Sequence, residues 1–182
     1  MRRTIRILLA LVATFALTIS AVSASSVHLK GGANAKPSFF DGGLYLRASG
    51  ALSGLGNADV VITLTATGNV TSTCTNKGTN AAPGQNPAPI TLTGTEKIPA
   101  SEIKNGTTPF DVRTTSAPAT IAGAPDCPNT NWTESIDDVA FTSATLKVEQ
   151  PEGTLVLTVS CTFNPPTSDG IVPSGSVSCT SS

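Results

Sequence analysis

The chain contains 182 residues, of which 13% are charged, with 11 basic and 12 acidic side chains. Its basic residues form no cluster, so nucleic acids and anionic membrane surfaces are not expected partners. The sequence also lacks a glycine-rich phosphate loop, a dinucleotide fingerprint and a complete nucleophile elbow, which argues against nucleotide-dependent enzymes and serine hydrolases.

Residues 1–24 are typical of a cleaved secretory signal peptide. Three arginines precede an apolar run over residues 7–19, and small residues at positions 22–24 offer a cleavage site. A run of 13 residues is shorter than the roughly 20 needed to cross a bilayer, which disfavours a retained anchor. Cleavage leaves 158 residues with eight basic and twelve acidic side chains. The expected location is extracellular, or periplasmic if the source has two membranes, with no membrane span in the mature chain.

Alternation of apolar and polar residues indicates β-strands through most of the remaining chain. The pattern is clearest from Val60 to Cys74, where apolar or small residues alternate with a row of mostly threonines. Strands are predicted at residues 44–52, 59–75, 89–97, 107–115, 138–150, 154–164 and 175–181. A change of phase between Phe141 and Leu146 predicts a β-bulge near residues 143–144.

These strands define an all-β fold class. Seven short strands separated by turn residues, each with one apolar face, favour a two-sheet antiparallel β-sandwich of immunoglobulin-like architecture. A small β-barrel is the alternative. Residues 44–182 are expected to form a single disulfide-stabilised domain. Residues 25–43 are expected to be a loosely ordered N-terminal segment, with Phe39 and Phe40 against the edge of the sandwich.

Four cysteines in an exported chain predict two disulfide bonds, because paired thiols persist outside the cytoplasm. Cys74, Cys161 and Cys179 lie on the apolar rows of their strands, whereas Cys127 lies in a proline-containing loop. The preferred pairs are therefore Cys74–Cys127 and Cys161–Cys179, and a Cys74–Cys161 bridge between the sheets stays open as an alternative. Because no Cys-x-x-Cys pair occurs, no metal or cofactor site is predicted.

Catalytic chemistry finds little support in the sequence. The single histidine, His28, falls in the segment expected to be mobile, where it cannot act as a positioned general base. A carboxylate pair among Glu134, Asp137 and Asp138 is the remaining basis for a hydrolase. The chain has only one Trp and one Tyr with which to line a sugar-binding cleft, which disfavours this interpretation.

Two weaker signals concern binding. Glu134, Asp137 and Asp138 offer oxygens to a calcium ion, but they lack the spacing of a known calcium loop, so a solvated turn is favoured. Trp132 follows a proline-rich loop and is a possible binding anchor, although a tryptophan that closes one end of the core is the favoured interpretation.

Three stretches resemble segments of small exported bacterial proteins that have no assigned activity. They are NAAPGQNPAP at residues 80–89, DDVAFTSAT at residues 137–145 and VSCTF at residues 159–163. The resemblance implies a bacterial, secreted, single-domain protein, and it carries over no active-site residue.

The sequence therefore predicts a secreted, non-catalytic binding or structural module that acts on an unknown extracellular ligand or protein. Its expected contact surface lies around Trp132 and residues 78–89. One alternative is a secreted protein inhibitor that presents the loop at residues 78–89, and a less favoured one is a carboxylate-dependent hydrolase.

Overall fold

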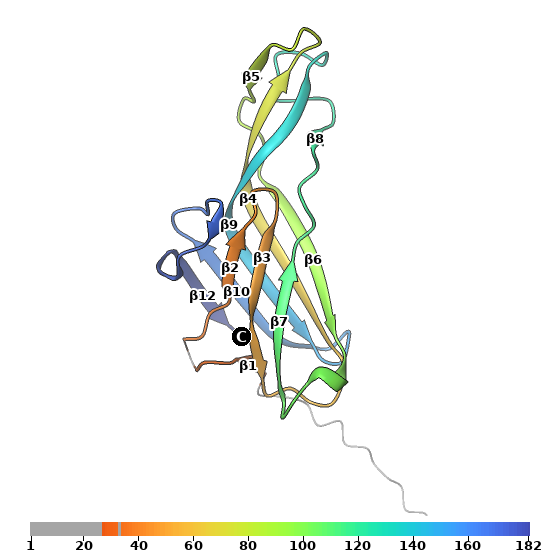
Figure 1. Ribbon diagram of the computed structural model, residues 1–182, viewed down its shortest axis with the longest axis vertical. Helices are drawn as coiled ribbons and strands as arrows, with labels where there is room; N and C mark the ends of the chain where they lie inside the picture. Colours follow the sequence, from red (N-terminus) through yellow and green to blue (C-terminus); the bar gives the residue numbers. More distant parts are fainter. Residues whose placement is uncertain (1–26, 33) are drawn as a thin grey trace, which may run out of the picture.

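Two antiparallel sheets, of five and seven strands, pack face to face in the computed structural model of the protein, which describes residues 27–32 and 34–182 (Figure 1). The sheets do not close into a barrel. The all-β sandwich predicted from the sequence is therefore confirmed. The predicted signal peptide, residues 1–24, lies outside the described residues.

The strands differ greatly in length, from two residues to 17. In chain order they are β1 (His28–Leu29), β2 (Ser38–Asp41), β3 (Leu46–Ser53), β4 (Val60–Thr75), β5 (Ala81–Pro83), β6 (Ile90–Ile98), β7 (Thr107–Arg113), β8 (Thr120–Ile121), β9 (Thr133–Glu149), β10 (Leu155–Phe163), β11 (Gly170–Ile171) and β12 (Val177–Ser181). Two single turns of 3-10 helix, η1 (Ala100–Glu102) and η2 (Ser174–Ser176), lie between strands.

None of the helical turns in the described part of the chain is long and apolar enough to cross a membrane.

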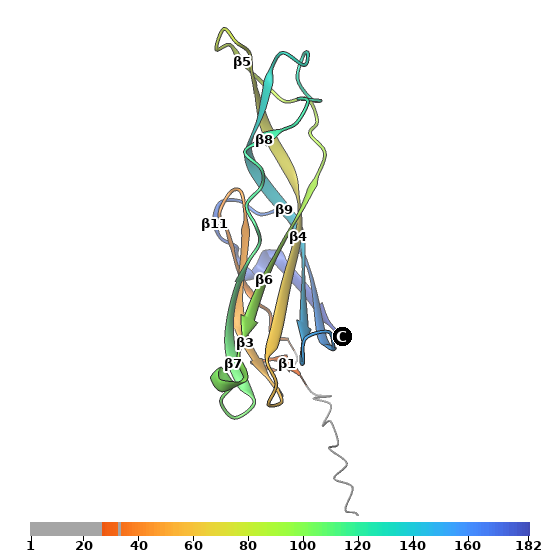
Figure 2. The same ribbon diagram turned by 90° about the vertical axis from the view of Figure 1, so that its right-hand side faces the viewer.

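Each sheet is built around its longest strands. In the smaller sheet, β3 pairs with β7 on one side and with β1 and β2 on the other, and β11 adds to the outer edge of β2. In the larger sheet the order is β12-β10-β9-β4, with β6 and β5 on the far side of β4 and β8 beside β9. Figure 2 shows the two layers from the side.

The seven predicted strands correspond to β3, β4, β6, β7, β9, β10 and β12. Six of them agree to within two residues at each end, but β9 begins at Thr133 rather than at residue 138. Its pairing with β4 contains two irregularities, at Thr142 and at Asp137, each of which is an extra residue in β9. The first lies one residue before the bulge that the phase change predicts near residues 143–144. The second interrupts the alternation that sequence analysis relies on, so the beginning of β9 was not recognised.

Residues 38–41 correct the expectation of a loosely ordered N-terminal segment. They form β2, which lies between β3 and β11 with both edges paired. Phe39 is 3% exposed and makes an edge-to-face contact with Phe163, with ring centroids 5.0 Å apart. His28, expected to be mobile, belongs to β1 and pairs with Ser53. These strands of two and four residues are too short for a periodic pattern to identify them.

The core lies between the facing rows of the two sheets. The alternation of apolar and polar residues in the sequence matches the alternation of buried and exposed side chains in the strands, because successive side chains of a strand point to opposite faces. Among the largest fully buried side chains are Phe141, Leu46, Leu52, Ile62, Leu64, Leu146, Val60, Val112, Val139, Val148 and Val159. Burying one such side chain contributes about 1.5–3 kcal/mol relative to exposure, so these rows dominate the stability of the body of the molecule.

At Gly94, β6 comes close to the end of β7. A Cβ atom added at this glycine would lie 1.8 Å from the backbone oxygen of Arg113. The two segments are also joined by a hydrogen bond of 3.0 Å from the backbone NH of Thr115 to the backbone oxygen of Thr93. The absence of a side chain at Gly94 therefore allows the edges of the two sheets to meet.

Replacing Gly94 with alanine is expected to lower the free energy of unfolding by about 1–3 kcal/mol, because a methyl group would have to displace backbone atoms. Chemical denaturation followed by circular dichroism measures the change. Gly175→Ala is the matched control, since a Cβ there has no atom within 4 Å. Equal stability of the two variants would contradict the close approach.

Candidate functional site

The end of the β4–β9 ribbon extends beyond the sandwich and forms a tip, defined as residues 69–90 and 118–140 (Figure 1). Here β5 pairs with β4 and β8 pairs with β9. A disulfide joins Cys74 to Cys127, with an S–S distance of 1.99 Å and 5.6 Å between the Cα atoms. The covalent bond thus attaches the loop before β9 to β4. It is one of the two pairs preferred from the sequence.

The second disulfide lies in the body rather than in the tip. Cys161 of β10 and Cys179 of β12 are directly opposite in the strand register and are bonded, with Cα atoms 4.1 Å apart. This bond fastens the edge strand β12 to the larger sheet. The structure contains no free cysteine, and all four cysteines belong to the described residues.

Glu134 is the buried polar centre of the tip. Its side chain is completely buried, and its carboxylate accepts hydrogen bonds from the hydroxyl of Ser72 at 2.7 Å and from the backbone NH of Asp126 at 3.3 Å. Gly84 packs directly against the hydroxyl group of Ser72, since a Cβ added at Gly84 would lie 2.0 Å from the Ser72 hydroxyl oxygen. Glu134 therefore holds the tip together. It is neither an exposed calcium ligand nor an accessible catalytic acid, the roles considered from the sequence.

The loop at residues 78–89 is fastened to the rest of the tip. The backbone NH of Gly84 donates to the Ser72 oxygen at 2.8 Å, and that of Gln85 donates to the Asp126 oxygen at 2.8 Å. Residues 81–83 form β5 against β4. The loop is therefore held on both sides, by a strand of the ribbon and by the segment that carries Cys127.

An apolar hollow of about 410 Å³ opens on the side of the tip. Its lining comes from the start of β6 with the residues before it, from the segment around β8 with the loop that follows it, and from β9. The residues are Ala88, Pro89, Ile90, Pro118, Thr120, Ile121, Ala122, Pro125, Asp126 and Ile136. Most of these side chains are apolar, so the hollow is suited to an apolar group of a ligand.

Trp132 directly precedes β9 in the tip and is partly exposed. Its backbone NH donates to the Asn129 oxygen at 3.1 Å, which closes a turn. Trp132 belongs neither to the buried core nor to the partly buried apolar residues packed against it. The core-closing role favoured from the sequence is thus replaced by a half-buried position at the end of the molecule.

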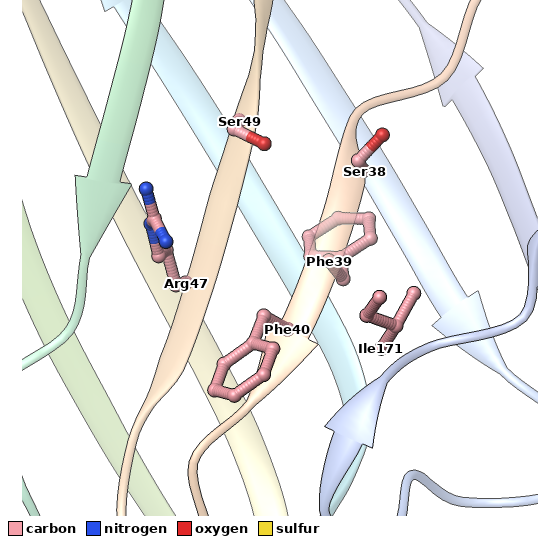
Figure 3. A pocket seen from close by; sticks show the side chains of 6 residues that line it. All are labelled: Ser38, Phe39, Phe40, Arg47, Ser49 and Ile171. Carbon is pink, nitrogen blue, oxygen red and sulfur yellow. The ribbon is translucent and has the colours of Figure 1, made fainter.

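An open groove of about 460 Å³ lies on the outer face of the smaller sheet (Figure 3). Phe40 and Ile171 are opposite one another on β2 and β11 and are 38% and 83% exposed. Arg47 borders the groove and forms an ion pair with Asp111. The groove offers only two exposed apolar side chains and a charged rim, whereas the hollow in the tip has an apolar lining from several segments.

Three carboxylates from distant parts of the chain meet where the ribbon leaves the sandwich. One oxygen from each of Asp41, Asp138 and Asp169 lies within 4.8 Å of the other two. The acidic set considered from the sequence is separated: Glu134 lies in the tip, Asp137 accepts a hydrogen bond of 2.6 Å from Thr73, and Asp138 joins this cluster. Asp41 and Asp169 had no sequence signal, because only tertiary structure brings them together.

Comparison of the chain with protein-family models, with curated proteins and with solved structures finds no match.

Removing the Cys74–Cys127 bond with a double serine variant is expected to destabilise the protein by up to about 4 kcal/mol, because the bond closes a loop of 53 residues. The tip should lose its order first, since little of the apolar core lies there. Hydrogen exchange followed by mass spectrometry should show faster exchange at residues 118–132, with residues 60–66 still protected. Uniform loss of protection would contradict a locally cross-linked tip.

The pH dependence of stability is expected to distinguish two neighbouring carboxylates, Glu96, which accepts a hydrogen bond from the Asp111 backbone NH, and Asp111, which is paired with Arg47. Burial, together with the charges of Asp111 and Glu102, raises the pKa of Glu96 above 4.5. Hydrogen bonds from Arg47 lower the pKa of Asp111 below 3.8. Protonated Glu96 therefore contributes stability below pH 4.5 that is lost as the pH rises through its raised pKa. Ionised Asp111 contributes stability above pH 3.8 that is lost as the pH falls through its lowered pKa.

Denaturation of two amide variants at a series of pH values checks these signs. Relative to the unmodified protein, Glu96→Gln should gain stability as the pH rises above 4.5. The difference in the free energy of unfolding between Asp111→Asn and the unmodified protein should stay constant above pH 4.5 and shrink only below pH 3.8. Parallel profiles for the two variants would show that the assigned environments are wrong.

Proposed function

We propose that the protein is a secreted, non-catalytic binding module whose contact surface is the tip. The observation that carries this proposal is the apolar hollow in the tip, at the end of a cross-linked ribbon that also carries the partly exposed Trp132. Partly exposed aromatic and apolar groups on a fixed scaffold are the usual centres of protein–protein contacts. A surface at the far end of a long molecule can also reach a partner without interference from the body.

Export supports an extracellular setting for this surface. The first 24 residues have the charge and apolar pattern of a signal peptide, and all four cysteines of the chain are in disulfide bonds. Disulfides of this kind form and persist outside the cytoplasm. The expected partner is therefore a protein surface or an extended peptide, met in the medium or at a cell envelope, that inserts an apolar side chain into the hollow.

A fixed contact surface has a thermodynamic advantage in this proposal. The Cys74–Cys127 bond and the buried Glu134 hold the flanks of the hollow before a partner arrives. Binding then requires less ordering of side chains and loops, and more of the contact energy is available for affinity.

The inhibitor alternative receives less support. An inhibitory loop is expected to protrude alone so that it can enter the cleft of a protease. Residues 81–83 are instead paired with β4, and Gln85 is hydrogen-bonded to Asp126. A contact that uses the whole tip agrees better with this arrangement than a contact through residues 78–89 alone.

Substitution of Ala122 by aspartate is expected to weaken binding at least tenfold, because a carboxylate in the apolar hollow would be desolvated without a partner. The measurement is binding of the fluorescently labelled mature chain to the surface of the cells that secrete it and to the proteins of their medium. Trp132 is the only tryptophan, so its emission should change when the tip becomes covered.

Ala119→Asp is the matched control, since Ala119 is exposed three residues away and does not line the hollow. It should bind like the unmodified protein. Equal binding by the two variants, or binding that leaves the emission of Trp132 unchanged, would rule out the tip as the contact surface.

A further inference from the structure

We infer that Asp41, Asp138 and Asp169 bind one calcium ion, which joins the two sheets where the ribbon leaves the sandwich. The three side chains approach from three separate segments. Asp41 ends β2 in the smaller sheet, Asp138 lies in β9 of the larger sheet, and Asp169 directly precedes β11. One oxygen from each lies within 4.8 Å of the other two.

Backbone contacts hold these segments at the cluster independently of a metal. The backbone NH of Val139 donates to the Gly43 oxygen at 2.8 Å, which ties the loop after β2 to β9. Phe141 and Thr167 exchange two bonds, one from the backbone NH of Phe141 to the Thr167 hydroxyl at 2.8 Å and one from the backbone NH of Thr167 to the Phe141 oxygen at 2.9 Å. Asp41 and Asp138 thus lie on paired strands, and the loop that carries Asp169 is tied to β9 through Thr167.

A buried carboxylate oxygen without a hydrogen-bond partner also supports a cation in this place. The Oδ1 atom of Asp138 is buried and has no hydrogen-bond partner among the described residues. It faces the same space as Asp169, because a Cβ added at Gly43 would lie 3.6 Å from Asp138 Oδ1 and 3.2 Å from Asp169 Oδ1. Buried polar atoms of native proteins almost always have a partner, and a cation between the carboxylates supplies one.

The electrostatics of the cluster also call for a positive charge. Asp41 is 1% exposed, and carboxylate oxygens of Asp138 and Asp169 lie within 4.8 Å of one of its oxygens. Within the described residues no basic side chain forms an ion pair with any of the three. Like charges at this separation repel strongly in a poorly solvated place, and a divalent cation removes the repulsion.

Calcium is the cation that these oxygens fit. It binds six to eight oxygen ligands at about 2.3–2.6 Å, so two of its ligands lie at most about 5 Å apart. Asp41 is already oriented, since its carboxylate accepts hydrogen bonds from the Gly43 backbone NH at 2.9 Å and from the Thr167 hydroxyl. Asp169 is exposed and gives the ion a path from solvent, and water completes the coordination. Extracellular sites of this kind have dissociation constants of about 0.1–1 mM.

Acid–base catalysis is a poorer explanation of the same cluster. A general acid or base must come within hydrogen-bond reach of the reacting group. The innermost carboxylate, Asp41, is 1% exposed and is not accessible to a substrate.

The test uses the mature chain freed of metal with a chelator and then titrated with calcium chloride. Isothermal calorimetry should give one site with a dissociation constant of about 0.1–1 mM. Calcium at about 10 mM should raise the melting temperature by several degrees. Asp138→Asn and Asp169→Asn should each weaken calcium binding at least tenfold.

Asp137→Asn is the matched control, since Asp137 is the neighbour of Asp138 but bonds to Thr73. It should bind calcium like the unmodified protein. In chelator, Asp169→Asn should melt at or above the temperature of the unmodified protein, because repulsion is relieved, and in calcium it should melt below it. Absence of calcium binding up to about 10 mM by the folded protein, or equal binding by Asp137→Asn and Asp138→Asn, would overturn the assignment.

Discussion

The pairing of β4 with β9 is the constraint on which the rest of the structure depends. It runs from Val61 opposite Glu149 to Thr75 opposite Thr133, through both the sandwich and the tip. Most strands of globular proteins have about five or six residues, whereas these have 16 and 17. Because one ribbon belongs to both parts, the register that buries the core also determines where the tip begins and which residues meet there.

Two bulges allow this ribbon to serve both parts. Each extra residue of β9 changes which side chains face inward, so Ala144 and Val139 are both buried although their spacing is odd. At the second bulge, Asp137 and Asp138 are adjacent in sequence but separate in space. Asp137 bonds to Thr73 of β4, and Asp138 lies beside Asp41 of the other sheet. A regular strand would not deliver a carboxylate to that position while keeping Val139 buried.

The strength of the local pattern decides what could be predicted from the sequence. Long strands with apolar alternation, such as β4 and β10, were predictable, and so was the pairing of Cys161 with Cys179, because both lie on the apolar rows of neighbouring strands. Strands of two to four residues carry no period, so β2 was missed although Phe39 is buried. The acidic cluster depends on contacts between residues 41, 138 and 169, and no local pattern reports such distances.

The tip shows how a segment without much core keeps a defined shape. A two-stranded ribbon flanked by strands of two or three residues buries little apolar surface and is marginally stable by itself. The tip compensates with the Cys74–Cys127 bond, which restricts the unfolded chain, and with Glu134, whose carboxylate is satisfied by Ser72 and Asp126. These contacts are directional, so they specify the positions of the loops more strictly than apolar packing does. Ala88, Pro89 and Ala122 line the hollow without belonging to the apolar core, so the proposed contact with a ligand would not draw on the packing that holds the tip together.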